Sequence, residues 1–417
     1  MSSHATAGEP MRVNRLTTNH QSDVSLATLS DGGWIVTYTS LTSVTNILFN
    51  AVFQQRYDAT GAYVGDETQV SPVSYNDHYN ATVTMLADGG WIVAYQIYHQ
   101  DYTYGDIYQQ RFDSSGTVVS AEARVNSYVT NPQGEANVTA LNDGGWVVTW
   151  LSDTQLPDGI GYDIYQQRYN AAGGTVGDET RVNQYVPFSQ DDPDVISLAD
   201  GGWLVVWATP TGTPDAPVGI FMRRYDAAGA TSGDDIKVNQ NTLGGQYGSS
   251  LSTLSDGGWI VTWSSHEDGN DDGVYQQRYS QAGVAVGGET LVNTYTINKQ
   301  SQGDVAGLAD GGWIVVWSSI GQDAFKTGIY QQRYDADGNT VGDETMVNEH
   351  SADNPTTPEV VALDDGSWVV SWSSVGSTYG STYDVYQRHF YADIDGTGIA
   401  DTLTGTAGSE AIFGLAG

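Results

Sequence analysis

A short phrase, Asp-Gly-Gly-Trp, recurs along the chain at a nearly constant interval, and this repeat limits the possible folds more than any other feature. Successive tryptophans of the phrase are 54–57 residues apart. A steady period of this length indicates an array of similar supersecondary units, each needing its neighbours to bury its faces. The seven copies, the last reading Asp-Gly-Ser-Trp, end at Trp34, Trp91, Trp146, Trp203, Trp259, Trp313 and Trp368.

The third unit shows the internal pattern of the repeat. Residues 138–141 and 146–150 predict two strands joined by a glycine hairpin turn, with Trp146 and Trp150 on one face. Residues 164–169 and 177–183 predict a third and a fourth strand, joined by a second glycine turn. Four antiparallel strands repeated radially form a propeller blade. The sequence therefore predicts an all-β, seven-bladed β-propeller with four-stranded antiparallel blades.

The two ends of the chain complement each other. The seventh unit lacks a fourth strand, and a segment resembling that strand stands at residues 8–14. We expect this N-terminal strand to close the ring, because closure removes an open sheet edge. Glu9 lies one residue further from the Val-Asn pair than in other copies, which a bulge would absorb. The predicted parts are an N-terminal tail at 1–10, the propeller at 11–392 and a C-terminal segment at 393–417.

Composition excludes several classes of partner. Fifty acidic residues against fifteen basic ones give a net charge of −35, which repels phosphate backbones and anionic lipid. We therefore expect no nucleic-acid partner. No apolar run reaches the length of about 18 residues that a spanning helix needs, so we expect no membrane insertion. The chain has no cysteine, which excludes disulfides and thiolate metal sites.

Six units repeat one charge pattern, an arginine followed eleven residues later by a carboxylate. Because the two positions fall on neighbouring strands of one hairpin, we expect a structural role in each blade, either a cross-strand ion pair or a hydrogen bond between blades. The seventh unit has His389 in place of the arginine. The expected pairs are Arg56–Glu67, Arg111–Glu122, Arg168–Glu179, Arg224–Asp235, Arg278–Glu289 and Arg333–Glu344.

One acidic loop carries candidate metal ligands. Asp268, Asn270 and Asp272 alternate before Gly273, as oxygen ligands do at the start of a calcium loop. The twelfth position, where an EF-hand has its bidentate glutamate, is Tyr279. We expect the three side chains to bind one Ca²⁺ with carbonyls or water completing the shell, at a Kd of about 10⁻⁴ to 10⁻³ M. The alternative is a loop whose acidic residues serve solubility alone.

The tail has a period of nine residues. Gly396-Thr-Gly-Ile-Ala-Asp-Thr-Leu-Thr is followed by a second, partial match and then by Gly414-Leu-Ala-Gly. This pattern resembles the nonapeptide repeats of RTX (hemolysin-type calcium-binding) secreted bacterial proteins, with Asp401 and Leu403 at the Asp and apolar positions. The resemblance implies that Asp401 is a Ca²⁺ ligand. It also implies export by a type I-like route to the cell surface or the extracellular space, and that the chain is a fragment or processed form of a larger protein.

The variable connections between strands share one face of the predicted ring, where we expect function to lie. One of them, residues 98–104, is rich in tyrosine, which suits stacking on sugar rings. The prediction is a secreted or cell-surface, calcium-associated binding module for adhesion or carbohydrate recognition, with a glycan or another extracellular ligand as partner. No catalytic or cofactor-binding residue is assigned, and the oligomeric state is left open. The alternatives are an extracellular polysaccharide hydrolase or lyase that uses carboxylates on this face, and a structural subunit of a surface layer or fibre.

Overall fold

The repeat folds as a ring of β-sheets. The computed structural model describes residues 6–16, 19–44, 47–74, 76–99, 105–153, 155, 161–184, 189–209, 218–241, 244–266, 272–323, 326–348, 354–375 and 383–391. All elements in these ranges are strands, grouped into seven antiparallel sheets. None of the described residues belongs to a helix that could cross a bilayer. The prediction of a seven-bladed, all-β propeller is confirmed.

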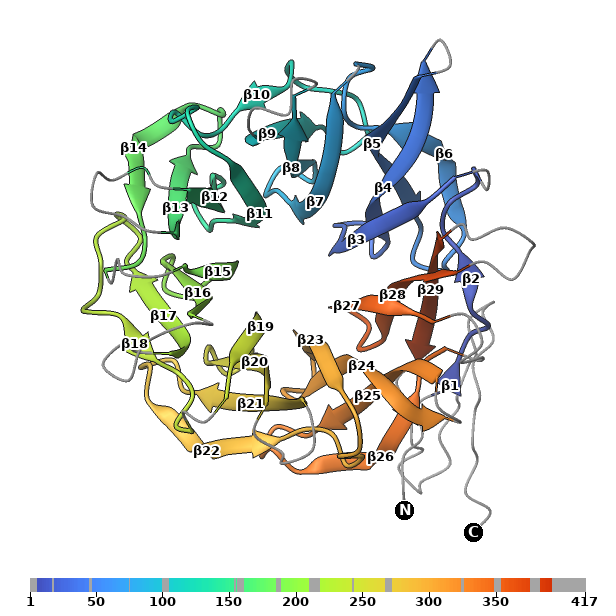
Figure 1. Cartoon of the computed structure of the whole chain (residues 1–417), viewed down its shortest axis with the longest axis vertical. Helices are drawn as coiled ribbons and strands as arrows, with labels where there is room; N and C mark the ends of the chain where they lie inside the picture. The colour runs from blue at the N-terminus through green and yellow to red at the C-terminus, as the bar shows by residue number, and fades with distance from the viewer. Residues whose placement is uncertain are drawn as a thin grey trace, which may run out of the picture.

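Each blade places its first strand at the centre of the ring and its later strands progressively outward (Figure 1). Blades 1 to 7 are numbered by these inner strands in chain order. The inner strands are β3 (Gln21–Thr28), β7 (Asp77–Met85), β11 (Gln133–Ala140), β15 (Asp191–Ser197), β19 (Gln246–Thr253), β23 (Gln300–Gly307) and β27 (Thr356–Ala362).

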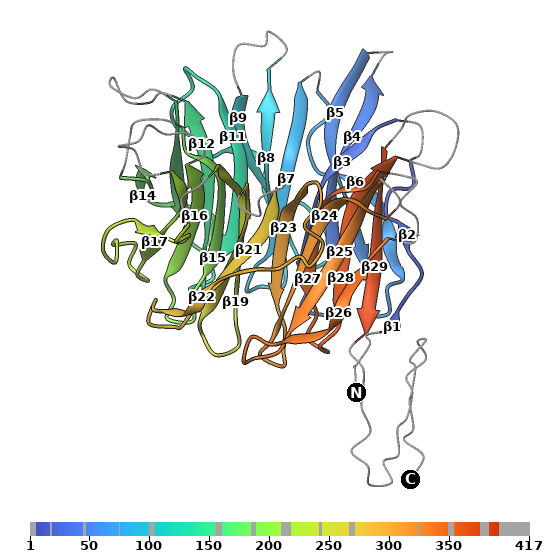
Figure 2. The ribbon, with the colours of Figure 1, turned by 60° about the horizontal axis from the view of Figure 1, so that its bottom comes forward.

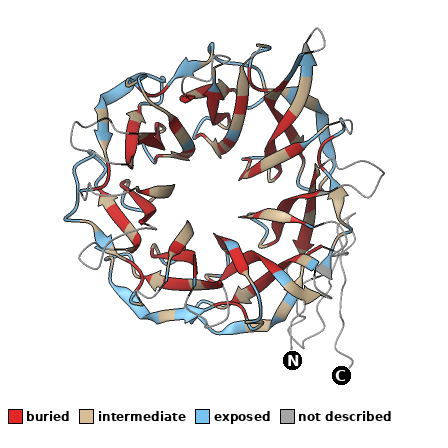
Figure 3. Ribbon diagram, in the orientation of Figure 1, coloured by how far each residue is buried: buried red, intermediate tan, exposed pale blue. Residues whose placement is uncertain are grey.

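The second and third strands form the buried middle of each blade. The second strands, each opening on the repeated tryptophan, are β4 (Trp34–Val44), β8 (Trp91–Tyr98), β12 (Trp146–Asp153), β16 (Trp203–Thr209), β20 (Trp259–Ser265), β24 (Trp313–Asp323) and β28 (Trp368–Val375). The third strands are β5 (Ile47–Tyr57), β9 (Gly105–Phe112), β13 (Tyr162–Tyr169), β17 (Gly219–Tyr225), β21 (Gly273–Tyr279), β25 (Lys326–Tyr334) and β29 (Tyr383–Tyr391). Figure 3 shows these strands as mostly buried and the outermost strands as mostly exposed.

The fourth strands lie on the outside, and the last one comes from the other end of the chain. In blades 1 to 6 they are β6 (Tyr63–Gln69), β10 (Ala123–Arg124), β14 (Thr175–Arg181), β18 (Ile236–Lys237), β22 (Ala285–Leu291) and β26 (Thr340–Met346). In blade 7, β1 (Thr6–Ala7) and β2 (Met11–Arg12) both pair with β29. The expected closure by the N-terminal segment is therefore confirmed, with residues 8–10 interrupting the strand where a bulge was predicted.

The repeated tryptophan joins neighbouring blades. Trp203 of blade 4 is buried, stacks on Tyr225 with ring centroids 5.1 Å apart, and donates its Nε1–H to Gln166 Oε1 of blade 3 at 2.9 Å. Five other blades repeat this bond, with Trp34, Trp91, Trp146, Trp313 and Trp368 as donors to the preceding blade. A buried indole N–H needs an acceptor, so in six of the seven blades a glutamine fixes both the spacing and the orientation of the next blade.

The two faces of the ring differ in their connections (Figure 2). One face carries the glycine turns, in which Gly32 has a φ of 81° and a Cβ on Gly33 would lie 2.1 Å from the Tyr57 carbonyl oxygen. This close approach explains the Gly-Gly of the phrase. The other face carries the variable connections between second and third strands and between successive blades. The hairpin of β4 and β5, both eleven residues long, rises from this face.

Candidate functional site

Every inner strand contains a β-bulge. The pairing of inner and second strands shifts register at one place in all seven blades, for example between Gly134 and Asn137 in β11. The bulged residue has a positive φ in each case, between 49° and 60°: Asp23, Asn80, Glu135, Asp192, Gly248, Gln302 and Thr357. Positive φ is costly for residues other than glycine and for Thr above all, and such strain tends to occur at functional sites.

The bulged inner strands surround a central channel. Its volume is about 560 Å³, and residues of all seven inner strands line it. One ring of side chains consists of the bulged residues themselves. A second ring, two residues further along each strand, consists of Ser25, Thr82, Asn137, Asp194, Ser250, Asp304 and Glu359. Residues two positions apart in a strand point to the same face, so both rings border the channel.

Hydrogen bonds between blades hold these carboxylates in place. Asp194 accepts from Asn137 Nδ2 of blade 3 at 2.7 Å and from the Leu251 N–H of blade 5 at 3.0 Å. Asp304 in the same way accepts from Ser250 Oγ at 2.6 Å and from the Val360 N–H at 2.7 Å. The second ring is therefore a belt that ties neighbouring blades together around the channel.

Blades 3 and 4 gather three carboxylates at the channel mouth. Glu135 Oε2 accepts the Asp192 N–H at 3.1 Å, and Asp192 Oδ2 accepts the Gly248 N–H at 2.8 Å. Glu135 is accessible from the channel but is surrounded by the ring. This partial desolvation raises its pKa to about 7, and the charges of Asp192 and then Asp191 add to the rise. Burial, followed by the charge of Asp192, raises the pKa of Asp191 to about 6.

Three tyrosines stand beside these carboxylates on the variable face. Tyr98, at the end of β8, is 40% exposed and packs edge-on against Tyr79, with ring centroids 5.9 Å apart. Tyr162 opens β13. Burial raises the pKa of Tyr162, and nearby charges, including those of Asp191 and Glu135, raise it further. Exposed aromatic faces beside carboxyl groups are the usual components of a sugar-binding site, because they combine stacking with directed hydrogen bonds.

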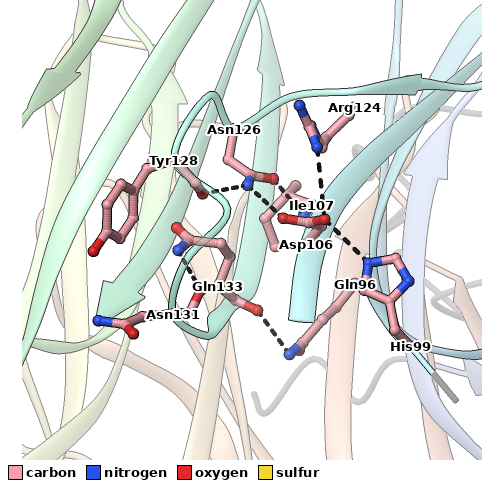
Figure 4. A network of polar contacts seen from close by, with 9 residues as sticks. All are labelled: Gln96, His99, Asp106, Ile107, Arg124, Asn126, Tyr128, Asn131 and Gln133. Carbon is pink, nitrogen blue, oxygen red and sulfur yellow. Dashed lines mark hydrogen bonds and ion pairs between the residues drawn. The ribbon is translucent and has the colours of Figure 1, made fainter. Parts of the chain in front are cut away.

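A polar network supports this part of the site from blade 2 (Figure 4). Gln96 Nε2 donates to the Gln133 carbonyl oxygen at 2.8 Å, which links β8 to the strand that carries Glu135. Asp106 accepts from Asn126 Nδ2 at 2.7 Å and contacts His99 Nε2 at 3.1 Å. His99 directly follows Tyr98, so the network fixes the chain on both sides of the tyrosine pair.

The expected arginine–glutamate ion pairs are wrong, whereas the alternative of hydrogen bonds between blades is confirmed: Arg111 Nη1 donates to the Ala171 carbonyl oxygen of the next blade at 2.8 Å. Arg168 Nη2 bonds Asp143 of the glycine turn at 2.7 Å rather than Glu179, and its guanidinium lies over Trp203 of the next blade, 5.4 Å from the ring centroid. The physical reason is a second bulge: Arg168 pairs with Val176, three residues short of Glu179. All six arginines repeat this contact, as Arg56–Asp31, Arg111–Asp88, Arg168–Asp143, Arg224–Asp200, Arg278–Asp256 and Arg333–Asp310.

The carboxylates of the fourth strands have a separate structural role. Glu179 Oε2 accepts the N–H of Ser127, the residue after the Val-Asn pair of the preceding blade, at 2.6 Å. Glu67, Asp235, Glu289 and Glu344 accept the equivalent N–H groups. Glu122 is the exception: the corresponding residue is Pro72, which has no N–H. Tyr95 Oη bonds Glu122 instead, and burial raises the pKa of this carboxyl.

The structure describes one of the four predicted calcium ligands. Asp272 is 1% exposed, and its carboxylate contacts Lys299 Nζ at 3.2 Å together with His266 and the Tyr247 hydroxyl. Asp268, Asn270 and Asp401 lie outside the described residues, as does the tail that resembles RTX repeats. Within the described ranges no group of three His, Asp or Glu side chains is placed to hold a metal ion. Calcium binding and the RTX resemblance stay predictions.

Comparison with known proteins identifies the fold. No protein-family model matches the chain, and a search of curated proteins finds no match. Among solved structures, a protein of unknown function from Dyadobacter fermentans DSM 18053 has a TM-score of 0.57 at 10% identity, over 93% of this chain and 99% of that one. A fungal alcohol oxidase in complex with copper has a TM-score of 0.56 at 11% identity, over 93% and 76%.

A third similar structure is an enzyme that acts on a polysaccharide. The Penicillium chrysogenum α-L-arabinanase, complexed with arabinobiose, has a TM-score of 0.53 at 14% identity, over 92% of this chain and 98% of that one. Identities this low show the shared propeller fold alone. Because the similar structures include an oxidase as well as a hydrolase, any functional assignment has to rest on the residues of the site.

The sequence predicts function on the variable face but does not indicate the group of carboxyls described above. The tyrosine-rich connection begins at Tyr98, which lies near Tyr162. Glu135, Asp191 and Asp192 were missed, because the third unit was read from Val138 onward and the bulged half of β11 was left out. Five of the seven units share a signal, a polar residue two positions after a Gln or His at the start of the inner strand: Asp23, Asn80, Glu135, Asp192 and Gln302.

Proposed function

We propose that the protein is a carbohydrate-active propeller that hydrolyses glycosidic bonds at the mouth of its central channel. The observation that carries this proposal is the group of neighbouring carboxyls Glu135, Asp191 and Asp192, in which the pKa of Glu135 is raised to about 7. Glycoside hydrolysis needs one protonated and one ionised carboxyl flanking the scissile bond. A polysaccharide hydrolase was the alternative in the sequence interpretation, and the site favours it over a binding module without catalysis.

In the proposed reaction Glu135 is the general acid. A pKa of about 7 keeps this carboxyl largely protonated in neutral or mildly acidic solution, so it can donate its proton to the leaving glycosidic oxygen. Asp192, whose charge contributes to that pKa, is the partner that takes a proton from the water molecule attacking the sugar carbon. Tyr98 and Tyr162 would stack on sugar rings at either side of the bond.

The similar structures support the substrate class. A propeller of this fold cleaves an arabinan in Penicillium chrysogenum, and the present chain has aromatic and carboxyl groups in the arrangement that such chemistry needs. Fold likeness by itself carries little weight here, so the proposal depends on the carboxyl group at Glu135 acting as an acid.

The test is hydrolysis of a panel of plant and microbial polysaccharides, including arabinan, by the wild-type chain and by Glu135→Gln. Glutamine keeps the acceptor for the Asp192 N–H but has no proton to donate, so we expect a loss of about 10²- to 10⁴-fold in kcat. Asp178→Asn, an exposed site on β14, is the matched control and should leave the rate unchanged.

Two outcomes would redirect the proposal. Glycan binding without turnover by the wild-type chain would return the protein to the class of adhesion and recognition modules. Full activity in Glu135→Gln would place the chemistry elsewhere. Running both assays with Ca²⁺ and with a chelator also tests whether the activity is associated with calcium, as the sequence predicts.

A further inference from the structure

The distribution of basic residues over the molecule is strongly uneven. The chain has fifteen lysines and arginines, all within the described ranges. Six of them are the arginines of the glycine-turn face, and others lie on outer strands, such as Arg124 and Arg181. Lys299 is held over Tyr247 and paired with Asp272. No lysine, arginine or histidine is among the residues that line the channel.

The channel lining is acidic on most sides. Five of the seven inner strands contribute a carboxyl group, and β15 contributes two. Blades 2 and 5 contribute only neutral groups, Asn80 and Thr82 in the former, Gly248 and Ser250 in the latter. The six lining acids are Asp23, Glu135, Asp192, Asp194, Asp304 and Glu359.

From this charge distribution we infer that the site selects its glycan by charge and takes oligosaccharides without acidic groups. The inference rests on the proposed function and narrows its substrate class. A uronate, sulfate or aldonate group entering the mouth would approach several carboxyl groups with no cation to pair with. In a narrow space walled by protein, such like-charge contacts are screened less than on an open surface. A neutral sugar meets the same carboxyls as hydrogen-bond acceptors.

The protonation of the channel carboxyls supports this inference and predicts that the exclusion of anionic ligands depends on pH. Burial is the main cause that raises the pKa of Asp194 to about 7 and of Asp304 and Glu359 above their ordinary values. Glu135 also titrates at about 7. The channel therefore becomes more negative as the pH rises from 6 to 8. A sugar acid is fully ionised over this whole range, so its exclusion should increase with pH.

The test uses matched ligands that differ only in charge. Each oligosaccharide of the panel is prepared with its reducing end reduced to the neutral alditol or oxidised to the anionic aldonate. Oligogalacturonate and its methyl ester form a second matched pair. Affinities are measured by calorimetry on Glu135→Gln, which binds without turnover. We expect the neutral ligand of each pair to bind about tenfold more tightly than the anionic one at low salt. This difference in affinity should increase from pH 6 to 8 and decrease in 0.5 M NaCl.

Variants locate the effect. The substitutions Asp304→Asn and Glu359→Gln together remove two carboxyls inside the channel. They should reduce the difference in affinity between the neutral and anionic ligands. Asp178→Asn removes one negative charge at an exposed position outside the channel and should leave this difference in affinity unchanged. The inference would be overturned by equal affinities for the neutral and anionic ligands, or by a difference in affinity that changes with neither pH nor salt.

The same data separate the inference from the proposed function. Charge-selective binding by a chain that hydrolyses nothing would contradict the hydrolase and leave the selection intact. Hydrolysis of anionic and neutral glycans at equal rates would contradict the charge selection and leave the hydrolase intact. A panel from which no neutral ligand binds would contradict both.

Discussion

At the scale of single residues, the contact between blades 4 and 5 shows the effect of losing one glutamine. Trp259 is 1% exposed and its indole N–H has no acceptor. The reason is Met222, which takes the place of the acceptor glutamine of other blades. Ile236 pairs with Met222 where four blades have a threonine that binds the glutamine amide. Blade 4 therefore lacks both the acceptor glutamine and the threonine that binds its amide.

Met222→Gln should stabilise the protein. The new amide oxygen would accept the Trp259 N–H, and an unsatisfied buried donor costs about 1–3 kcal/mol. Adding Ile236→Thr supplies the partner for the amide N–H, so the double variant should gain more than the sum of the two single changes. Chemical denaturation measures all four proteins, with Met222→Leu as the apolar control. A destabilised double variant would mean that blade 4 has repacked around the methionine.

Residue-scale features also mark the limit of sequence interpretation. The Trp and glycine positions follow from backbone geometry and could be predicted. The bulge at Glu135 could not be predicted from the third unit alone, because a positive φ at Asp, Asn, Glu, Gln or Thr has no strong local signature; the recurring polar position is visible only when the units are compared. Glu135 and Asp192 of the proposed site are both bulged residues.

At the scale of elements, the hairpin of third and fourth strands explains the failed pairing. An eleven-residue spacing fits a cross-strand contact in a regular hairpin. The positive φ of Gly177 and the register shift after Gln166 add residues to β14, so Glu179 moves away from Arg168 and toward the preceding blade. Spacing predicted the two strands correctly but not their register.

Arg168→Ala should cost about 1–2 kcal/mol of unfolding free energy, from the lost cation–π contact with Trp203 and the lost Asp143 pair. In double-mutant cycles, Arg168 and Asp143 should couple by about 0.5 kcal/mol or more, whereas Arg168 and Glu179 should be additive. Thermal and chemical unfolding of the wild type and the five variants provide the measurement. Coupling between Arg168 and Glu179 would restore the pairing first expected from the sequence.

The N-terminal strands should contribute strongly to stability. Deleting residues 1–14 removes Val13, which is fully buried, and Asn14, which donates to Asp384 Oδ1 at 2.7 Å and accepts the Val385 N–H at 2.9 Å. Loss of a buried valine and an orphaned carboxylate should cost at least about 3 kcal/mol. Calorimetry should show a lower Tm, and hydrogen exchange should increase in β28 and β29. Deleting residues 1–5 alone is the control; an unchanged Tm in the longer deletion would argue against closure by these strands.

At the scale of the whole molecule, the channel makes stability depend on pH. A carboxyl whose pKa is higher in the folded than in the unfolded chain binds more protons when folded, so stability falls as pH rises through the folded pKa. Asp194 and Glu135, with pKa values of about 7, act in this way. His389 has the opposite sign: burial lowers its pKa to about 4, so it costs stability as pH falls from about 6.5.

Between pH 6.5 and 8 the carboxyls therefore decide the slope. We expect the unfolding free energy of the wild type to decrease over this range, by an amount on the order of 1–2 kcal/mol for Asp194. Asp194→Asn should flatten the dependence, and Asp178→Asn, with the same change in net charge, should not. Urea titrations at four pH values measure the slope. A wild-type slope of zero would mean that the channel carboxyls titrate alike in the folded and unfolded chains.

The closure of blade 7 has a consequence for how the protein is made. Asn14 bonds Asp384, 370 positions further along the chain. On a ribosome that adds about 5–20 residues per second, the N-terminal strand must wait roughly 20–70 s for the strand that receives it. During that time the growing arc of blades has two open ends, and blade 1 lacks the neighbour that covers Trp34. A chaperone that masks such ends would have most to do in the interval before the last blade emerges.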